Sequence, residues 1–278
     1  MEKFLRLLQA TMTEPKSGGA MHLIALASVL ILTFILCVLF HDAKESVFRA
    51  ILISIWAVLF LMEVISQISY SYTFTEDGSI VWSYHWGKFP LQLCDTPTYL
   101  LLPIALLKKG KLRDTLSAYM ATYILLGGVA TYAFPASIYT TSVYHNIHTL
   151  VHHGLQITSC IFIAVRQRNG LTISVFVKAI CFFLIAVSVA TLYNVVMHKL
   201  YPEQLINMFF ISPYFVKTVP EVVNEAWHKM HWLSRIGLYI VGLTVISAFF
   251  FTIYRWIFHF EKKAKTEAVE INNKKETV

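Results

Sequence analysis

Long apolar runs separated by short polar segments dominate the pattern along the chain. Several of them reach the roughly 20 residues that a helix needs to cross a bilayer. We therefore predict an all-α polytopic membrane protein, a bundle of seven transmembrane helices. The third is short and interrupted by proline. The predicted spans are 21–41, 48–70, 90–107, 114–134, 146–166, 174–197 and 234–258.

The pattern changes at both ends of the predicted bundle. Residues 1–20 read as an amphipathic segment in which Phe4, Leu5, Leu8 and Met12 share one helical face, which suits a helix lying on the membrane surface. Residues 21–258 form the predicted seven-helix domain. Residues 259–278 are charged and poor in aromatic side chains, which predicts a disordered cytoplasmic tail.

Composition supports a membrane protein and gives its orientation. The chain is 56% hydrophobic and 14% charged, against about 25% charged residues in a soluble domain. About two thirds of its 23 Lys and Arg residues fall on one side of the predicted spans. Because basic loops stay in the cytoplasm, we predict a cell-membrane protein with its N-terminus outside and its C-terminus cytoplasmic. The net charge of +7 follows from this topology, and we expect no nucleic-acid partner.

The four cysteines all fall inside predicted spans, so none is placed for an ordinary secreted disulfide. Three of them have no polar neighbours and are interpreted as packing residues. These are Cys37, Cys160 and Cys181.

The fourth cysteine lies in an unusual start to a span, "FPLQLCDTPTYLLLP". Pro90 suits the first turn of a helix, because its missing N–H would be unpaired there. Cys94 would then lie one turn inside, near the positive end of the helix dipole. Pro97 should kink the helix just after Cys94 and free a backbone carbonyl. Asp95 acts against a thiolate, so Cys94 needs a base or a cation nearby. The alternative is that Cys94 is a small hydrophobe.

Other polar residues within predicted spans fall at a similar depth, in the outer half of the bundle. An ionisable residue in a span is costly and suggests a function. Glu63 lies in the second span, His152 and His153 in the fifth, and Asn194 in the sixth. Glu63 has a second interpretation, as a structural partner of Asn194 or of a histidine.

The run "HNIHTLVHHG" leaves two interpretations open. His148 and His152 have the spacing of a metal-binding pair, but the sequence nearby offers no cysteine or HExxH glutamate to complete a site. We therefore predict no metal and no cofactor. We expect His145 and His148 to be solvated near the membrane surface. His153 is the better candidate for a base that faces the bundle, and Gly154 after it allows close backbone approach.

Four motifs together resemble the YwaF-like integral membrane proteins, a family related to the transmembrane protein 164 acyltransferase group. They are "GGAMHLIAL", "EVISQ", "FPLQLCDTPTYLLLPIAL" and "HHGLQI", in that order between about residues 18 and 197. The resemblance implies that Cys94 is a nucleophile and His153 its general base. It implies supporting polar roles for Glu63, Asp95, Asn194, His22 and Gln92.

The chain departs from the family pattern at two places. Gln92 stands where the family has a histidine, and "ISPYF" replaces a Gly-Pro-Trp-type stretch after the sixth span. The first change alters the surroundings of Cys94, and the second alters the segment that would cover it.

Three classes of function fit these features. The first is a lipid acyltransferase or lipid hydrolase that acts on membrane phospholipids through a Cys/His pair. The second is a non-catalytic sensor, binding or transport protein with a polar pocket at the same place. The third is metal-dependent hydrolysis through the histidine run.

Overall fold

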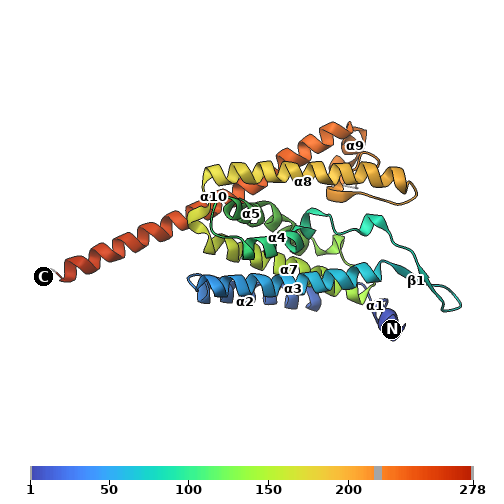
Figure 1. Cartoon of the computed structure of the whole chain (residues 1–278), viewed down its shortest axis with the longest axis horizontal. Coiled ribbons are helices and arrows are strands. Elements are labelled where there is room, and N and C mark those ends of the chain that lie inside the picture. The colour runs from blue at the N-terminus through green and yellow to red at the C-terminus, as the bar shows by residue number, and fades with distance from the viewer. Residues whose placement is uncertain (1, 216–220, 277–278) are drawn as a thin grey trace.

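Each apolar segment of the sequence forms a helix in the computed structural model, which describes residues 2–215 and 221–276 (Figure 1). The helices pack side by side into one bundle. They are α2 (Ala20–Leu39), α3 (Glu45–Ser69), α4 (Thr96–Leu106), α5 (Lys111–Tyr119) continued by α6 (Leu125–Ala133), α7 (Val143–Arg166), α8 (Ile173–Leu200) and α10 (Trp232–Glu276).

Five of these segments are long and apolar enough to cross a membrane. They are Ala20–Leu39, Glu45–Ser69, Lys111–Ala133, Ile173–Leu200 and Trp232–Glu261. The apolar stretch Leu93–Leu106 is shorter, and α7 is long but carries many polar side chains. The structure thus confirms a helical membrane protein with several spans, and the number seven stays a prediction.

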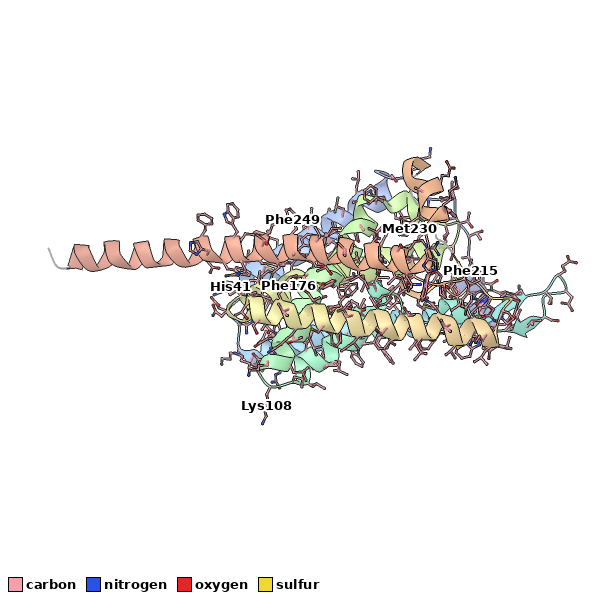
Figure 2. The ribbon with its side chains drawn as sticks, turned by 90° about the horizontal axis from the view of Figure 1, so that it is seen from above. His41, Lys108, Phe176, Phe215, Met230 and Phe249 are labelled. Atoms are coloured by element: carbon pink, nitrogen blue, oxygen red, sulfur yellow. The ribbon has the colours of Figure 1, made fainter. Side chains whose placement is uncertain are left out.

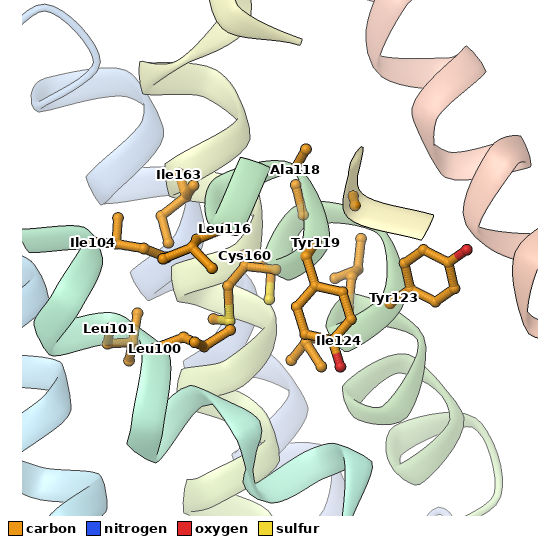
Figure 3. Packing of buried hydrophobic residues seen from close by; sticks show 14 of the residues in the cluster. Leu100, Leu101, Ile104, Leu116, Ala118, Tyr119, Tyr123, Ile124, Cys160 and Ile163 are labelled. Atoms are coloured by element: carbon orange, nitrogen blue, oxygen red, sulfur yellow. The ribbon is translucent and has the colours of Figure 1, made fainter. Parts of the chain in front are cut away.

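Helix α7 lies in the middle of the bundle and contacts α2, α3, α5 and α6. Its C-terminal half packs into a closed apolar core with α4, α5 and the π-helical turn η3 (Met120–Ile124), as Figure 3 shows. Cys160 and Ile163 of α7 are fully buried there beside Tyr119. A π-turn leaves a carbonyl without its helical donor, and the Gln156 side chain donates to the Ile124 carbonyl at 2.5 Å.

The outer layer of the bundle is apolar and faces away from the core. In the apolar stretches of α2 and α10, only 11% of the residues are buried. In Lys111–Ala133 the corresponding share is 72%. Phe249, for example, projects from α10 away from the neighbouring helices in Figure 2. Apolar side chains on the outside are what a lipid-facing surface requires.

A β-hairpin that we did not predict joins α3 to the third segment. Strands β1 (Tyr72–Phe74) and β2 (Ile80–Trp82) pair antiparallel, with Tyr72 opposite Trp82. An Asp-Gly pair in the turn, with Gly78 at φ 81°, supplies the positive φ that such turns need. The alternation of large apolar residues around this pair was the available signal.

The N-terminal helix α1 is shorter than the predicted segment and spans Glu2–Leu8. It packs on the hairpin, because Tyr72 donates a hydrogen bond to the Leu5 carbonyl at 2.6 Å. Leu5 and Leu8 are buried, whereas Phe4 is 45% exposed. The four apolar residues expected on one face are therefore divided between the protein and its surroundings.

The C-terminal tail differs from our prediction of disorder, because α10 continues as a helix to Glu276 and leaves the bundle (Figure 1). Residues 262–276 are rich in Lys, Glu and Ala, which favour helix. A helix already formed in the span extends through such residues without a new nucleation step. Residues 277–278 of the predicted tail lie outside the described residues.

The segment between α8 and α10 folds over one end of the bundle. It contains the short 3₁₀ turn η6 (Met208–Phe210) and helix α9 (Glu221–Lys229). We call residues 207–212 the cap. Residues 216–220 of this segment lie outside the described residues. Three further 3₁₀ turns are η1 (Trp86–Lys88), η4 (Pro135–Ser137) and η5 (Arg168–Gly170).

Candidate functional site

A cavity of about 670 Å³ lies between α3, α6, α7 and the start of the third segment, beneath the cap. Its volume is in the range of small-molecule and cofactor sites. Aromatic and aliphatic side chains form part of the wall, among them Phe89, Leu93 and Ile138. The polar part of the wall includes Glu63, Tyr70, Lys88, Gln92, Cys94, Asp95, His145, His148, His152 and His153.

Cys94 lies in the 3₁₀ turn η2 (Leu93–Asp95), immediately before α4. The prediction that placed it one turn inside a helix was wrong, because Pro97 and not Pro90 occupies the first turn of α4. Pro97 has no N–H to donate to the Leu93 carbonyl, and the Thr96 hydroxyl donates to that carbonyl at 2.7 Å. The Cys94 thiol points to the Asp95 carboxyl, with 3.8 Å between Sγ and Oδ1.

The two adjacent histidines of α7 both line the cavity but have different partners. His153 donates from Nδ1 to the Thr149 carbonyl at 2.8 Å, so its Nε2 carries the lone pair. His152 is 2% exposed and donates from Nε2 to the Cys94 carbonyl at 2.9 Å. The structure therefore places His153 in the same cavity as Cys94, and it also links His152 to the backbone of that cysteine.

Glu63 approaches the histidines from α3. Its Oε2 lies 3.5 Å from Nε2 of His148, and its Oε1 accepts a hydrogen bond from Gln67 at 2.6 Å. The His148 side chain is only 13% exposed, so the expectation that it is solvated was wrong. His148 is shielded from solvent because α3 packs against α7. His145, one turn earlier, is partly buried and pairs with the Tyr70 hydroxyl at 3.1 Å.

Gln92 and Asn194 both hold the cap through side-chain hydrogen bonds. The Gln92 amide donates to the Asn207 carbonyl at 3.0 Å and accepts from the Phe209 N–H at 2.8 Å. The Asn194 amide likewise donates to the Met208 carbonyl at 3.0 Å and accepts from its N–H at 2.6 Å. The Asn194 side chain therefore binds the cap and is not the partner of Glu63.

The cap backbone that these amides hold is strained. Phe209 and Phe210 have φ angles of 55° and 58°, which large side chains rarely adopt. Both rings line the cavity. The four amide hydrogen bonds keep this conformation in place over the cavity.

His22 lies apart from the cavity, among the described residues. Its Nε2 donates to the Tyr132 carbonyl at 3.1 Å, and its Nδ1 accepts from the Gly18 N–H at 3.1 Å. With both ring nitrogens engaged, it fastens the start of α2 to the end of α6. Its supporting role is thus one of helix packing.

Two glycines set how closely the helices around the site approach. A Cβ atom on Gly154 would lie 2.6 Å from Val29 Cγ2, which confirms the close approach predicted at this position. On α6, a Cβ atom on Gly127 would lie 3.6 Å from Cys94 Cβ, so Cys94 packs directly over this glycine.

Sequence reasoning missed the partners that orient the site. Gln67 lies four residues after Glu63 on the same helix face, and that spacing was a usable signal. Thr149 precedes His153 by four residues in the same way. Tyr70 and Lys88, whose ammonium group lies 5.2 Å from the Tyr70 ring centre, gave no signal in the sequence.

These features define a multi-pass helical membrane protein with an open cavity that its helices and a cap line with polar and apolar side chains. A family model, the TMEM164 family, matches residues 17–258. The chain belongs to the TMEM164 family, which agrees with the resemblance that its motifs carry. Comparisons with curated proteins and with solved structures gave no match.

Proposed function

We propose that this protein is a lipid acyltransferase or lipid hydrolase in which Cys94 is the nucleophile and His153 is the general base. The observation that carries the proposal is the cavity, because it holds a thiol and a histidine with a free ring nitrogen inside a lipid-facing bundle. A nucleophile and a base at one apolar cavity are the elements of covalent acyl transfer.

The hydrogen bonds assign the protons of the first step. The Asp95 carboxyl accepts from the thiol and keeps it protonated at rest. Nε2 of His153 takes the thiol proton as Sγ attacks the ester carbonyl of a lipid. The ester C–O bond breaks, the departing alkoxide receives the proton from His153, and an acyl-thioester remains on Cys94.

The second step returns the enzyme to its starting state. A lipid hydroxyl or water gives its proton to His153 and attacks the thioester carbonyl. The C–S bond breaks, the new ester or the free acid leaves, and the thiolate recovers the proton. The acceptor alone decides whether the reaction is a transfer or a hydrolysis.

The cavity wall supports a phospholipid as the substrate. Phe89, Leu93 and Ile138 offer an apolar surface to an acyl chain. Lys88 also lines the cavity and offers a cation to a phosphate group. No nucleic-acid partner is part of the proposal, since the basic residues follow the topology of the spans.

Orientation in the cell membrane belongs to the same proposal. The N-terminal helix, the hairpin and the cap gather at one end of the bundle, and α10 leaves it at the other end (Figure 1). Because the more basic loops lie at the α10 end, we place that end in the cytoplasm. The cavity then opens toward the outer leaflet.

A trapped intermediate tests the proposal. The protein, purified in detergent, is incubated with mixed phospholipids and quenched at short times. Mass spectrometry should then show a hydroxylamine-sensitive acyl adduct on the peptide that contains Cys94. The adduct should be absent from Cys94→Ala and present in Cys160→Ala, whose thiol lies in the closed core.

The absence of an adduct on the wild-type protein at all quench times would reject thioester chemistry. Binding of phospholipid without an adduct would then favour the second candidate, a non-catalytic sensor, binding or transport protein. The observation that favours this candidate is the cap, which closes over the cavity through side-chain amides.

A further inference from the structure

Three side chains from two helices converge on one wall of the cavity. Glu63 comes from α3, and His148 and His152 come from successive turns of α7. One possible ligand atom from each lies within 4.8 Å of the others. The proposed acyl-transfer step uses none of the three, so their convergence needs a separate explanation.

The hydrogen bonds fix which ring nitrogens are free. His152 donates from Nε2 to the Cys94 carbonyl, which leaves the lone pair on Nδ1. That Nδ1 is buried and has no hydrogen-bond partner. Metal-ligating histidines are held in this way, with the other N–H donated to a backbone carbonyl.

The remaining two groups, His148 and Glu63, face each other. Nε2 of His148 is also buried without a hydrogen-bond partner, and it faces Oε2 of Glu63 at 3.5 Å. Gln67 donates to the other carboxylate oxygen, Oε1, at 2.6 Å, which fixes the plane of the carboxylate. Buried nitrogens left unpaired beside a buried carboxylate are costly, and a cation between them removes that cost.

The separations suit a small tetrahedral ion. Ligands about 2.0–2.1 Å from zinc at tetrahedral angles are about 3.4 Å apart, close to the 3.5 Å between Glu63 and His148. The widest pair of ligand atoms, at most 4.8 Å apart, must approach by at most about 1.4 Å.

We propose that Glu63, His148 and His152 bind one divalent cation of the zinc class. Two imidazoles and one carboxylate favour zinc over magnesium or calcium, which prefer oxygen ligands. Three protein ligands leave the fourth position open, and all three residues line the cavity. The bound ion therefore faces the space in which a lipid ester would lie.

Metal content of the purified protein tests the site. The full-length chain in detergent is stripped with a chelator, exposed to Zn²⁺ in excess Mg²⁺, desalted and analysed for zinc. We expect one zinc per chain. His148→Gln and Glu63→Gln should each reduce the zinc content at least tenfold. His145→Gln is the matched control, one turn away on the same helix, and should keep the full content.

Two further measurements separate binding from misfolding and from acyl transfer. Each variant should elute as the wild type does on size exclusion. Zn²⁺ should raise the melting temperature of the wild type and of His145→Gln, but not that of His148→Gln or Glu63→Gln. Cys94→Ala, which cannot form an acyl adduct, should still bind one zinc.

The proposal is overturned if the stripped wild type takes up less than a tenth of an equivalent. It is also overturned if well-folded His148→Gln and Glu63→Gln keep their zinc, or if His145→Gln loses it. None of these results bears on the Cys94 adduct, which is measured separately.

Discussion

Each half of the bundle contains a glutamate surrounded by basic side chains, and the two clusters are built differently. In the core half, Arg113 donates to Glu45 at 2.5 Å and Arg49 lies 3.3 Å from the same oxygen. In the cavity half, Glu63 faces His148 at 3.5 Å, and neither Nε2 of His148 nor Nδ1 of His152 has a hydrogen-bond partner.

We interpret the core half as the one built for stability. Arg113 is 2% exposed, and its guanidinium also lies over the Phe48 ring at 5.0 Å. A buried charge with this many partners is costly to disturb. Around Glu63, we propose that a cation takes up the two histidine nitrogens that have no hydrogen-bond partner.

The largest expected effect compares the two halves of the bundle through one cysteine in each, Cys94 in the cavity and Cys160 in the core. Cys94→Ala should reduce phospholipid acyl transfer or hydrolysis about 1,000-fold, because it removes the proposed nucleophile. Cys160→Ala removes a thiol from the core and should leave the rate within about twofold while lowering the free energy of unfolding by about 1 kcal/mol. Equal rates of both variants in a phospholipid turnover assay would show that Cys94 has no catalytic part.

The core cluster should respond next most strongly. Glu45→Ala leaves Arg113 buried without its carboxylate and should reduce the free energy of unfolding by about 3 kcal/mol. Unfolding in detergent with increasing denaturant measures it. Glu2→Ala breaks the exposed pair with Arg6 and should cost less than about 1 kcal/mol. Similar losses in the two variants would contradict a core cluster built for stability.

The cap should show an intermediate effect. Gln92→Ala removes two hydrogen bonds to residues 207 and 209 and should destabilise the cap by about 2 kcal/mol. Limited proteolysis within the cap should become faster, while cleavage in the hairpin turn 75–79 serves as the internal control. An unchanged cleavage rate in the cap would mean that Asn194 alone holds it.

The smallest effect sharpens the contrast between the glutamates. Glu63→Gln keeps the size of the side chain and removes a buried charge whose partner, His148, lies 3.5 Å away. We expect the free energy of unfolding, measured without added metal, to change by less than about 1 kcal/mol. A loss as large as that of Glu45→Ala would mean that Glu63 is a structural partner of His148.

Much of the helical fold was predictable, because apolar runs of sufficient length have few other structures in a membrane. The predicted spans 48–70 and 146–166 match α3 and α7 closely. The helical tail was missed, since the prediction relied on its charge and its few aromatic residues and not on the helix propensity of Lys, Glu and Ala. The hairpin was missed because its strands are only three residues long.

The candidate site was predictable in its members more than in its contacts. Glu63, Cys94, Asp95 and the two histidines stood out as polar residues in apolar spans, and they share a cavity. Which histidine meets the Cys94 carbonyl depends on how α7 is rotated against η2, and no local pattern encodes that rotation. The cap contacts of Gln92 cross 115 residues of sequence.

The polar interior of α7 has a consequence for how the chain enters the membrane. Helices such as α2 and α8 are long and apolar enough to cross a membrane, but α7 is not among the helices of the described chain that meet this criterion. Its buried Asn146, His152 and Gln156 each oppose partition into lipid. We therefore expect α7 to enter the membrane together with its neighbouring helices and not alone, which would make the middle of the protein a cooperative step of its assembly.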